Sequence, residues 1–436
     1  MKKYDFIIIG GGIAGICIAE MFSRDNLKVL LIEKNKNLIS EASTSQHGWF
    51  HFGSLYAILE NNQTLKNMLN NLINITKYYS HFKNMNLTFS KKKFRFKKKR
   101  GWFNDDKINY YVASRNDKDL KNRNFIKYLK NIYDWEKKIK LFVARHKIFE
   151  SKLDIKDFAE KIASASYKDY SKKFIVKPDL KKINLNPDTH FKISGLDRTL
   201  NTEVIVRSLL QSYLSNNGEI KLKTNFKKYS LKQNTIEILT SIGKFQSKYL
   251  INASGKNIPL ISKNKNIKNF VSPIGSFYPA LCNENFVRLS PKKIETLNHL
   301  IHYHDNKKYS VISSALSFPY EKNLKNENSV KKQFESILKK NFKDYSNVKY
   351  KKIYNGVKTE FIDKSSRNYN YKIISEEKNK GVYTVIPGKF TLSFSLAVEM
   401  YKLIFKKAPR QKKYIKKNKL YKENLISISK HNILWR

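Results

Sequence analysis

The pattern of apolar and polar positions is clearest at the start of the chain. Residues 5–9 form a mostly apolar run whose only charged residue is Asp5, and residues 28–32 form a second run rich in leucine and β-branched residues. Such runs are typical of strands buried in a parallel sheet. Between them, residues 13–22 repeat apolar positions with helical spacing. The first thirty residues therefore predict a strand, a helix and a second strand.

Later segments alternate between the same two patterns. Helical spacing predicts helices at 57–82, 118–174, 202–214, 330–341 and 392–405. Short strands are predicted within 87–112 and 267–318, and at 219–223, 235–239, 244–250 and 381–386. The chain contains no internal repeat, and no Pro/Gly/Ser-rich linker separates two independent domains.

Between the first strand and helix, Gly10, Gly12 and Gly15 have the G-x-G-x-x-G spacing, and Glu33 ends the second strand. The first glycine allows a tight turn, the second leaves room for a pyrophosphate, and the third lets helix and strand pack closely. The helix start offers free N–H groups and the positive end of its dipole to phosphates. Glu33 can accept hydrogen bonds from an adenosine ribose. Together these features predict a dinucleotide-binding site.

The apolar start also resembles a secretory signal peptide or a membrane anchor, because Met1-Lys-Lys precedes it. The glycine cluster, Asp5 and Glu20 argue against both interpretations. The only cysteines are Cys17 and Cys282, so neither a disulfide framework nor a cysteine-based metal site is indicated. We therefore expect a cytoplasmic protein without a transmembrane segment.

Charge is the unusual part of the composition. The 436 residues include 86 Lys+Arg and 36 Asp+Glu, a formal net charge of +50. Such a charge suggests a polyanionic partner, either nucleic acid or an anionic membrane surface. However, the basic residues are mostly lysines spread along the chain, whereas nucleic-acid-binding faces gather arginine and aromatic residues in a confined patch. The densest cluster, 91–100, could be a strand with one sheltered face. A compositional bias is the simpler explanation, and nucleic-acid binding stays open as an alternative.

Four segments, in order, resemble the D-amino-acid-oxidase-like superfamily of FAD-dependent oxidoreductases. They are 9–15 with Glu33, 43–53, 202–226 with 251–255, and 385–391. The resemblance implies an α/β fold, in which a Rossmann-like FAD-binding domain of the GR2 type carries an inserted mixed α+β substrate domain. The FAD-binding domain would comprise 1–75, 195–265 and 350–436, and the substrate domain 76–194 and 266–349. The intervening substrate domain resembles no family that we can name.

The resemblance also implies which residues bind FAD. The first segment would hold the ADP half and the second would lie beside the pyrophosphate and isoalloxazine. The backbone near Phe226 would reach the adenine, and the last turn would face the flavin pyrimidine. The residues so assigned are Gly10, Gly12, Ile13, Ala14, Gly15, Glu33, Lys34, Ser43, Thr44, Ser45, His47, Gly48, Phe226, Ala253, Ser254, Gly255, Gly388, Lys389, Phe390 and Thr391.

Three residues are candidates for catalysis: His51, Lys358 and Lys389. Related enzymes often clamp a substrate carboxylate with an arginine, where this chain has Lys358. A lysine is a point charge without arginine's bidentate fork. Lys389 could stabilise the charge of a reduced flavin, or it could be an ordinary solvated lysine. His51 could act as a base, orient the substrate, carry a covalent flavin link or be structural.

We expect no metal site. His302 and His304 share one face of a predicted strand, but Asp305 is the only further ligand nearby. Lining of a pocket or surface exposure explains the two histidines more simply.

The sequence thus predicts a flavoenzyme that binds FAD non-covalently and oxidises a C–N or C–O bond of a small polar substrate, of the amino acid, hydroxy acid or amine type. A first alternative is a flavoenzyme that acts on RNA or another polyanion. A second is a non-catalytic nucleotide-binding protein. A plain NAD enzyme would not require the segments at 43–53 and 385–391. The substrate, the electron acceptor and the oligomeric state cannot be read from the sequence.

Overall fold

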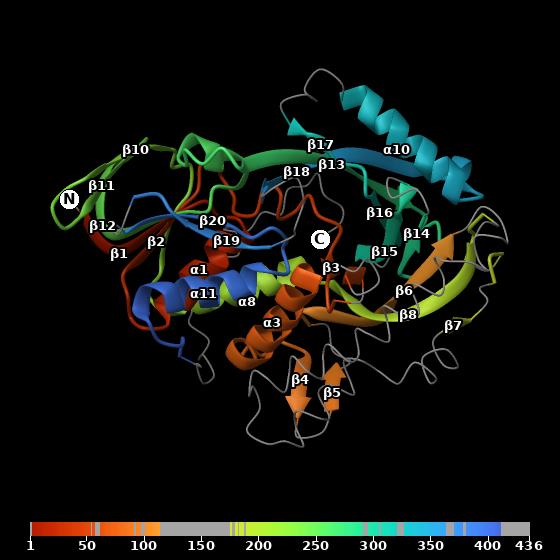
Figure 1. Ribbon diagram of the computed structural model, residues 1–436, viewed down its shortest axis with the longest axis horizontal. Coiled ribbons are helices and arrows are strands. Elements are labelled where there is room, and N and C mark those ends of the chain that lie inside the picture. The colour runs from red at the N-terminus through yellow and green to blue at the C-terminus, as the bar shows by residue number, and fades with distance from the viewer. Residues whose placement is uncertain are drawn as a thin grey trace.

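Two sheets lie side by side along the long axis of the molecule (Figure 1). The protein's structure, a computed structural model, describes residues 2–53, 55–56, 62–90, 93–96, 101–113, 175–176, 179–181, 183–186, 189–290, 295–304, 307–320, 327–362, 370–377 and 381–410. The helix predicted at 118–174 and the basic tail beyond residue 410 lie outside these ranges. In the ranges given, no helix is long and apolar enough to cross a membrane.

The first sheet is built around β1 (Lys2–Ile9). This strand pairs in parallel with β2 (Val29–Ile32) on one side and with β12 (Gly243–Asn252) on the other. Further parallel pairs join β2 to β9 (Glu219–Lys221) and β12 to β20 (Val382–Ile386). Antiparallel strands β10 (Phe226–Leu231), β11 (Ile236–Thr240) and β19 (Lys372–Ser375) complete the sheet. Ile7 and Ile8 are fully buried, so the predicted central strand is confirmed.

Four helices pack against one another beneath this sheet (Figure 1). At the centre, α1 (Ile13–Ser23) contacts α8 (Thr202–Ser215) and α11 (Ser393–Phe405), and α3 (Asn62–Tyr78) contacts α11. The bounds of α8 and α11 match the predicted helices at 202–214 and 392–405 closely. α3 ends at Tyr78, before the predicted end at residue 82, and residues 57–61 of the predicted helix lie outside the described ranges.

A buried ion pair explains the acidic residue inside the apolar first helix. Glu20 and Arg24 are 2.7 Å apart, and both side chains are almost completely shielded from solvent. Ser212 of α8 donates to the Glu20 carboxylate at 2.7 Å, and Arg24 donates to the Tyr78 carbonyl at 2.9 Å. Glu20 therefore joins α1 to α8, and the buried charges of Glu20 and Arg24 are paired with each other.

The second sheet is mostly antiparallel. Its main path runs in the order β17 (Phe318–Pro319), β13 (Ile267–Tyr278), β16 (Lys307–Ser314), β15 (Leu297–His304), β14 (Phe286–Leu289), β6 (Phe103–Ala113), β8 (Thr189–Leu200) and β3 (Trp49–Phe50). β18 (Tyr350–Phe361) pairs with β13, and β7 (Ile175–Val176) pairs with β8. Only β14 and β6 run parallel in this sheet as described.

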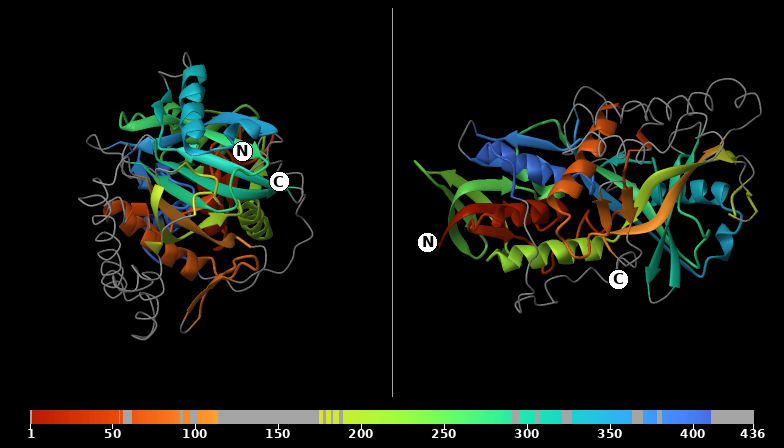
Figure 2. Two further views of the ribbon diagram at one scale, coloured as in Figure 1. Left: turned by 90° about the vertical axis from the view of Figure 1, so that its right-hand side faces the viewer. Right: turned by 90° about the horizontal axis from the view of Figure 1, so that it is seen from below.

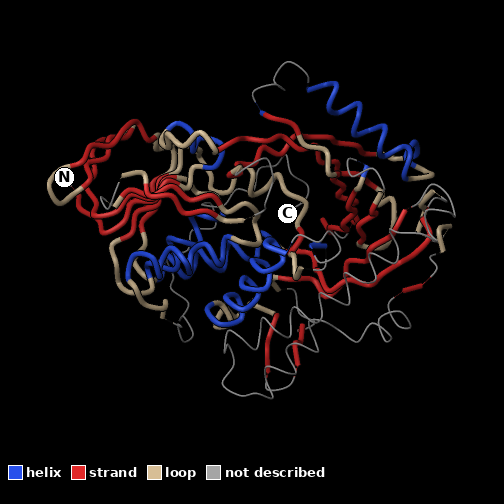
Figure 3. The backbone as a smooth tube through the Cα atoms, in the orientation of Figure 1, coloured by secondary structure: helices blue, strands red, loops and turns tan. Residues whose placement is uncertain are grey.

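Smaller elements surround the two sheets. α10 (Glu327–Asn341) buries Val330, Phe334 and Leu338 against the second sheet. β4 (Leu87–Ser90) pairs with β5 (Lys93–Phe96), so part of the basic cluster at 91–100 is a strand, as predicted. Two 3₁₀ helices, η1 (Gly255–Leu260) and η3 (Tyr345–Asn347), complete the description. Figures 2 and 3 show α10 on the side of the molecule opposite to α1, α3, α8 and α11.

The strands of the first sheet come from the start, middle and end of the chain, as expected for a discontinuous nucleotide-binding unit. The α/β class with a Rossmann-like unit and a second domain is confirmed. The proposed domain boundaries stay a prediction. Sheet membership differs from them at β3, at the end of β8 and at β18, which all pair within the second sheet although they lie in ranges assigned to the FAD-binding domain.

Candidate functional site

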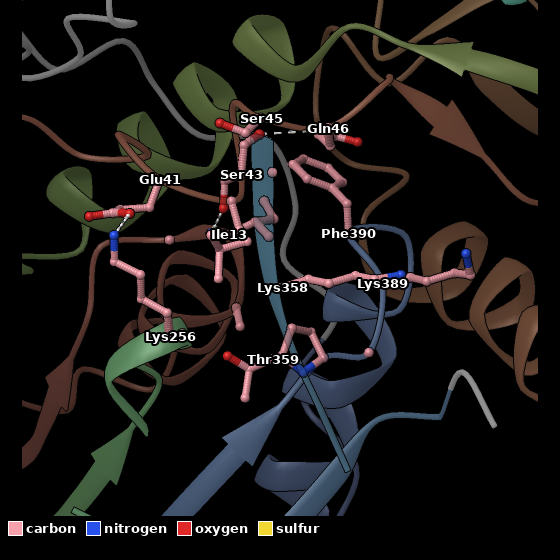
Figure 4. A pocket seen from close by; sticks show the side chains of 18 of the residues that line it. Ile13, Glu41, Ser43, Ser45, Gln46, Lys256, Lys358, Thr359, Lys389 and Phe390 are labelled. Atoms are coloured by element: carbon pink, nitrogen blue, oxygen red, sulfur yellow. Dashed lines mark hydrogen bonds and ion pairs between the residues drawn. The ribbon is translucent and has the colours of Figure 1, made fainter. Parts of the chain in front are cut away.

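A cavity of about 1320 Å³ lies between the two sheets. Ordinary small-ligand pockets occupy roughly 300–1,000 Å³, so this one has room for an extended ligand together with a second molecule. Segments far apart in the sequence line it, and Figure 4 shows Ser43, Ser45 and Gln46 facing the same space as Lys358 and Phe390. The cavity therefore connects the glycine turn at one end with the strands of the second sheet at the other.

The glycine turn has little space for side chains. Gly10 has a φ of +107°, and a Cβ there would lie 2.5 Å from the Ala253 carbonyl oxygen. A Cβ on Gly15 would lie 2.0 Å from the Gly10 carbonyl oxygen. By contrast, a Cβ on Gly12 would meet only the Ser43 hydroxyl, at 3.3 Å, and Gly12 lines the cavity. Gly10 and Gly15 are thus required by the chain itself, whereas Gly12 keeps the cavity wall open for a ligand.

The N-terminus of α1 faces the cavity directly after this turn. Its N-cap, Gly12, offers no side-chain hydrogen bond, and the Ile13 N–H donates instead to the Ser43 hydroxyl at 3.0 Å. Ala14, in the first helical turn, also lines the cavity. A helix start of this kind presents N–H groups and a partial positive charge, which suits a phosphate.

Glu33 has two roles at the same end. One carboxylate oxygen accepts a hydrogen bond from the Gly11 N–H at 2.7 Å, and the other accepts from the Asn35 N–H at 2.8 Å. Each carboxylate oxygen has a second lone pair, so the group can still accept from a ligand hydroxyl. Glu33 lines the cavity beside Thr224 and Phe226. The acid therefore fixes the glycine turn as well as facing the place expected for a ribose.

An ion-pair cluster also lines the cavity (Figure 4). Glu41 lies 2.7 Å from Lys256 and 3.3 Å from Lys34. Burial pushes the pKa of the Glu41 carboxyl up, but the two lysines outweigh it and the net pKa is below its usual value. The cluster joins the loop after β2 to the 3₁₀ helix η1.

Two histidines line the opposite end, His51 buried and His47 partly buried. His51 is 3% exposed, and burial together with the charge of Lys389 lowers its pKa to about 4, against the opposing pull of Asp197. Burial, Lys389 and neighbouring cations also lower the pKa of His47 well below its usual range. His302 is buried rather than on the surface, and its ring nitrogen lies 3.2 Å from the His47 carbonyl oxygen. At neutral pH these imidazoles are therefore uncharged.

The positive charges at this end come from lysines. Lys358 of β18 pairs with Glu360 at 2.9 Å, and Glu360 is buried behind it. The Lys389 ammonium lies 5.6 Å from the centre of the Tyr56 ring. The two acidic residues that line the cavity, Glu33 and Glu41, are both at the glycine-turn end in the described part of the chain. The lining of the end beside the second sheet therefore carries lysine ammonium groups, one of which is paired with the Glu360 carboxylate.

Comparison with protein families shows which family the chain belongs to. The sequence model of the family described as "FAD dependent oxidoreductase" matches residues 5–311, which is most of the chain. The chain belongs to this family. As a member, it is an FAD-dependent oxidoreductase, and the suspected resemblance is confirmed. Comparison with curated proteins gave no match.

Solved structures of flavoenzymes share the fold at low sequence identity. L-α-glycerophosphate oxidase from Mycoplasma pneumoniae with FAD bound has a TM-score of 0.61 and 16% identity, over 95% of this chain and 99% of that one. L-proline dehydrogenase from P. horikoshii has a TM-score of 0.57 and 13% identity, over 94% and 96%. Glycine oxidase from Geobacillus kaustophilus has a TM-score of 0.58 and 10% identity, over 96% and 100%.

The cavity of this FAD-dependent oxidoreductase fits its cofactor. The open wall at Gly12 and the start of α1 suit the pyrophosphate, and Glu33 suits a ribose. At the other end, Gly388 has a φ of +67° in the turn that leads into α11. The Lys389 N–H donates to the Pro387 carbonyl at 2.7 Å, and the Thr391 hydroxyl donates to the Trp49 carbonyl at 3.2 Å. These bonds hold the turn against the histidine segment.

Most of the predicted site residues line the cavity, from all four segments and from the position of Lys358. Three do not. Gly15 lies behind the turn, the Thr44 hydroxyl donates to the Glu41 carbonyl, and the Gly48 carbonyl accepts from the Leu200 N–H. These three residues shape the cavity wall from behind, and their assignment to direct contact with the cofactor has no support from the cavity lining.

Sequence reasoning missed the contribution of the second sheet. Val287, Asn298, Ser313 and Ile274 are paired neighbours on four adjacent strands, and all four line the cavity. The Ser313 hydroxyl donates to the Asn298 side-chain oxygen at 2.5 Å. Polar residues within apolar strands were the available signal, but their grouping depends on strand order. Gln46, Trp49 and Tyr56 were also missed, although they lie within or next to a predicted segment.

Proposed function

We propose that the protein oxidises a C–N or C–O bond of a small polar substrate, with hydride transfer to the flavin. The observation that carries the proposal is the continuous cavity that joins the residues assigned to FAD to an end lined by His51, Lys358 and Lys389. FAD, when bound, supplies the hydride acceptor; the protein supplies position, charge and a proton acceptor.

Charge argues for an anionic group on the substrate. The described residues that line the second-sheet end contribute two lysine ammonium groups, and the Glu360 carboxylate that pairs with Lys358 lies outside the lining. Lys358 is the better placed of the two for a carboxylate or phosphate, because it lies in the second sheet, on β18 next to the strand β13 that carries Ser272. Asn298, Ser313 and Ser272 offer uncharged polar contacts for the rest of a small molecule.

His51 is suited to accept a proton. It is uncharged at neutral pH and lines the cavity, and an imidazole can take the proton of a substrate O–H or N–H as the hydride leaves the adjacent carbon. The related structures named for proline, glycine and glycerophosphate enzymes support the proposal of a small polar substrate.

The test is anaerobic reduction of the purified yellow protein by candidate donors, followed by its visible spectrum. The donors are amino acids of both configurations, hydroxy acids, amines and sugar or glycerol phosphates. We expect one donor class to bleach the flavin, and His51→Asn to keep its flavin but bleach far more slowly. A flavin-loaded protein that no donor reduces would favour the non-catalytic alternative. Tight RNA binding that weakens steeply with salt would favour the polyanion alternative.

A further inference from the structure

Asp197 is a completely buried carboxylate next to the proposed active site. It lies on β8 with no exposed surface, and it was not among the predicted site residues. Three groups donate hydrogen bonds to it: the Trp49 indole N–H at 2.9 Å, the Phe52 N–H at 2.8 Å and the Tyr110 hydroxyl at 2.8 Å. Three donors therefore hold this carboxylate in place behind the cavity wall, and its charge acts on the His51 imidazole.

The imidazole of His51 is the titratable group nearest to this charge on the cavity side. Its Nδ1 lies 3.7 Å from the Asp197 Oδ2, beyond hydrogen-bond distance but within electrostatic contact. The ring packs between Trp49, at 4.2 Å between centroids, and Tyr56, at 5.3 Å. Lys389, from the turn before α11, disfavours a charged ring, and the His51 ring in turn lowers the pKa of the neighbouring His47.

We propose that Asp197 is a positioning residue for His51: it holds the ring with a proton on Nδ1, so that Nε2 is the bare nitrogen that accepts the substrate proton. The proposal rests on the proposed function for its chemical step. The tautomer of a histidine is set by the partner of its other nitrogen. A fixed anion on the Nδ1 side favours the N–H there, and the two aromatic neighbours limit rotation of the ring.

The step balances as a two-electron oxidation. The C–H bond of the substrate breaks and its hydride passes to the bound flavin, while the adjacent O–H or N–H bond breaks and its proton passes to His51 Nε2. The substrate gains a C=O or C=N bond, and the flavin takes up two electrons. The resulting imidazolium lies between Lys389, which opposes its charge, and Asp197, which is the only carboxylate in electrostatic contact with the ring among the residues described.

A purely structural role for Asp197 is the competing explanation, because its hydrogen bonds join β3, β6 and β8. Both explanations predict that Asp197→Asn lowers stability. The decisive readout is therefore which ring nitrogen of His51 carries the proton, because a purely structural role of Asp197 would leave that unchanged.

The experiment uses ¹⁵N-histidine-labelled protein loaded with FAD and without substrate, studied by NMR at pH 7.5. His51→Asn assigns the His51 signals by their loss. In the wild-type protein we expect the proton on Nδ1. In Asp197→Asn we expect a mixture with a substantial share of the Nε2–H form. Wild-type protein with the proton on Nε2, or an unchanged tautomer in Asp197→Asn, would overturn the proposal.

A second variant keeps the proposal testable if Asp197→Asn fails to fold. Tyr110→Phe removes a donor from Asp197 but keeps the charge, so the carboxylate can stabilise an imidazolium more strongly. We expect the Nδ1–H form to persist and the midpoint of His51 protonation to rise by about one pH unit.

Tyr111→Phe is the matched control, because the Tyr111 side chain points to the other face of β6 and packs in a different core. An unmoved midpoint in Tyr110→Phe, or an equal shift in Tyr111→Phe, would also overturn the proposal.

Flavin reduction separates this inference from the proposed function. With a working donor, Asp197→Asn should slow flavin reduction by about tenfold or more while its flavin content stays normal. If the NMR results are as expected and no donor reduces the flavin, then Asp197 does set the tautomer of His51 and the proposed function is wrong.

Discussion

Two glycines with a positive φ differ in what a new side chain would meet. Gly10 and Gly243 both have φ values in the left-handed region, +107° and +129°. A Cβ on Gly10 would collide with the Ala253 backbone, whereas nothing lies within 4 Å of the corresponding position on Gly243. Alanine at either position would therefore strain the backbone, but only alanine at position 10 would also displace the glycine turn that faces the cavity.

We accordingly expect Gly10→Ala to weaken FAD binding by about tenfold or more, because β1 and β12 must move apart at the turn. Gly243→Ala should lower stability by about 1–2 kcal/mol without changing FAD affinity. Titration of the FAD-free protein, followed by flavin fluorescence, measures both. Equal losses of affinity in the two variants would show that strain alone is responsible.

Lys358 can be separated from the other lysines of its own strand. Lys358→Met should raise the KM for an anionic donor by roughly 10- to 100-fold, because a charged hydrogen bond to the substrate is lost. Flavin content should not change. Lys351→Met is the control, since Lys351 also pairs with a glutamate, Glu335, but lies on the opposite face of β18. A similar rise in KM for Lys351→Met would assign the effect to general surface charge.

The role of a residue could be predicted from the sequence when residues close to it in the chain determine that role. Gly10, Gly12 and Glu33 are recognisable because a strand, a turn and a helix within some thirty residues determine their roles. Asp197 joins the site through the pairing of β8 with β3, and Asn298 through the pairing of β15 with β14 and β16. No local pattern contains that information, so neither residue could be assigned beforehand.

Among the elements, α11 depends on α3 for its position. The Asn71 side-chain oxygen of α3 accepts hydrogen bonds from the backbone N–H and the hydroxyl of Ser395, at 3.1 and 3.0 Å. The Asn74 side chain also donates to the Ser395 hydroxyl at 3.0 Å. Because α11 follows the turn at 388–391 directly, these bonds hold that turn in place.

Asn71→Ala should therefore lower the free energy of unfolding by about 1–3 kcal/mol, since it leaves the buried Ser395 N–H without its acceptor. Urea unfolding measures the loss. Thr76→Val on the same helix is the control, because Thr76 bonds only to carbonyls of its own helix, at Leu72 and Ile73. A loss in Thr76→Val as large as that in Asn71→Ala would contradict a special role for the contact between the helices.

The helices and strands also differ in whether one segment of the sequence is enough to predict them. Helices α8, α10 and α11 were predictable because their apolar positions repeat within one segment. Strand β3 is only two residues long, and it exists because β8 offers it a free edge. In β6, irregular register with β8 hides the alternation that would have marked one long strand.

For the whole molecule, buried histidines make stability depend on pH. His51, His299 and His302 each have a pKa of about 4, chiefly because burial disfavours the charged ring. In the unfolded chain a histidine pKa is about 6.5. Between these values the unfolded state binds more protons than the folded state. The contribution of each histidine is therefore complete above pH 6.5 and is lost as the pH falls towards 4.

Thermal unfolding between pH 7.5 and 4.5 should show a falling Tm. His299→Gln should fall less steeply over the same interval, because one buried imidazole has been removed. Glutamine can replace the contacts of His299 with the Glu284 carbonyl and the Ser310 hydroxyl. Parallel curves for the two proteins would show that groups other than this histidine determine acid stability.

The short strand β3 has a consequence for how such a protein can be recombined. Trp49 belongs by chain position to the cofactor-binding half. It nevertheless pairs with Thr199 of β8, donates to Asp197 and accepts from Thr391. A chimera that took its second sheet from a relative and kept residues 1–75 intact would place a foreign β8 beside this segment. A chimera that exchanges substrate specificity between relatives must therefore transfer residues 48–52 together with the second sheet, although these residues lie within a segment assigned to the cofactor.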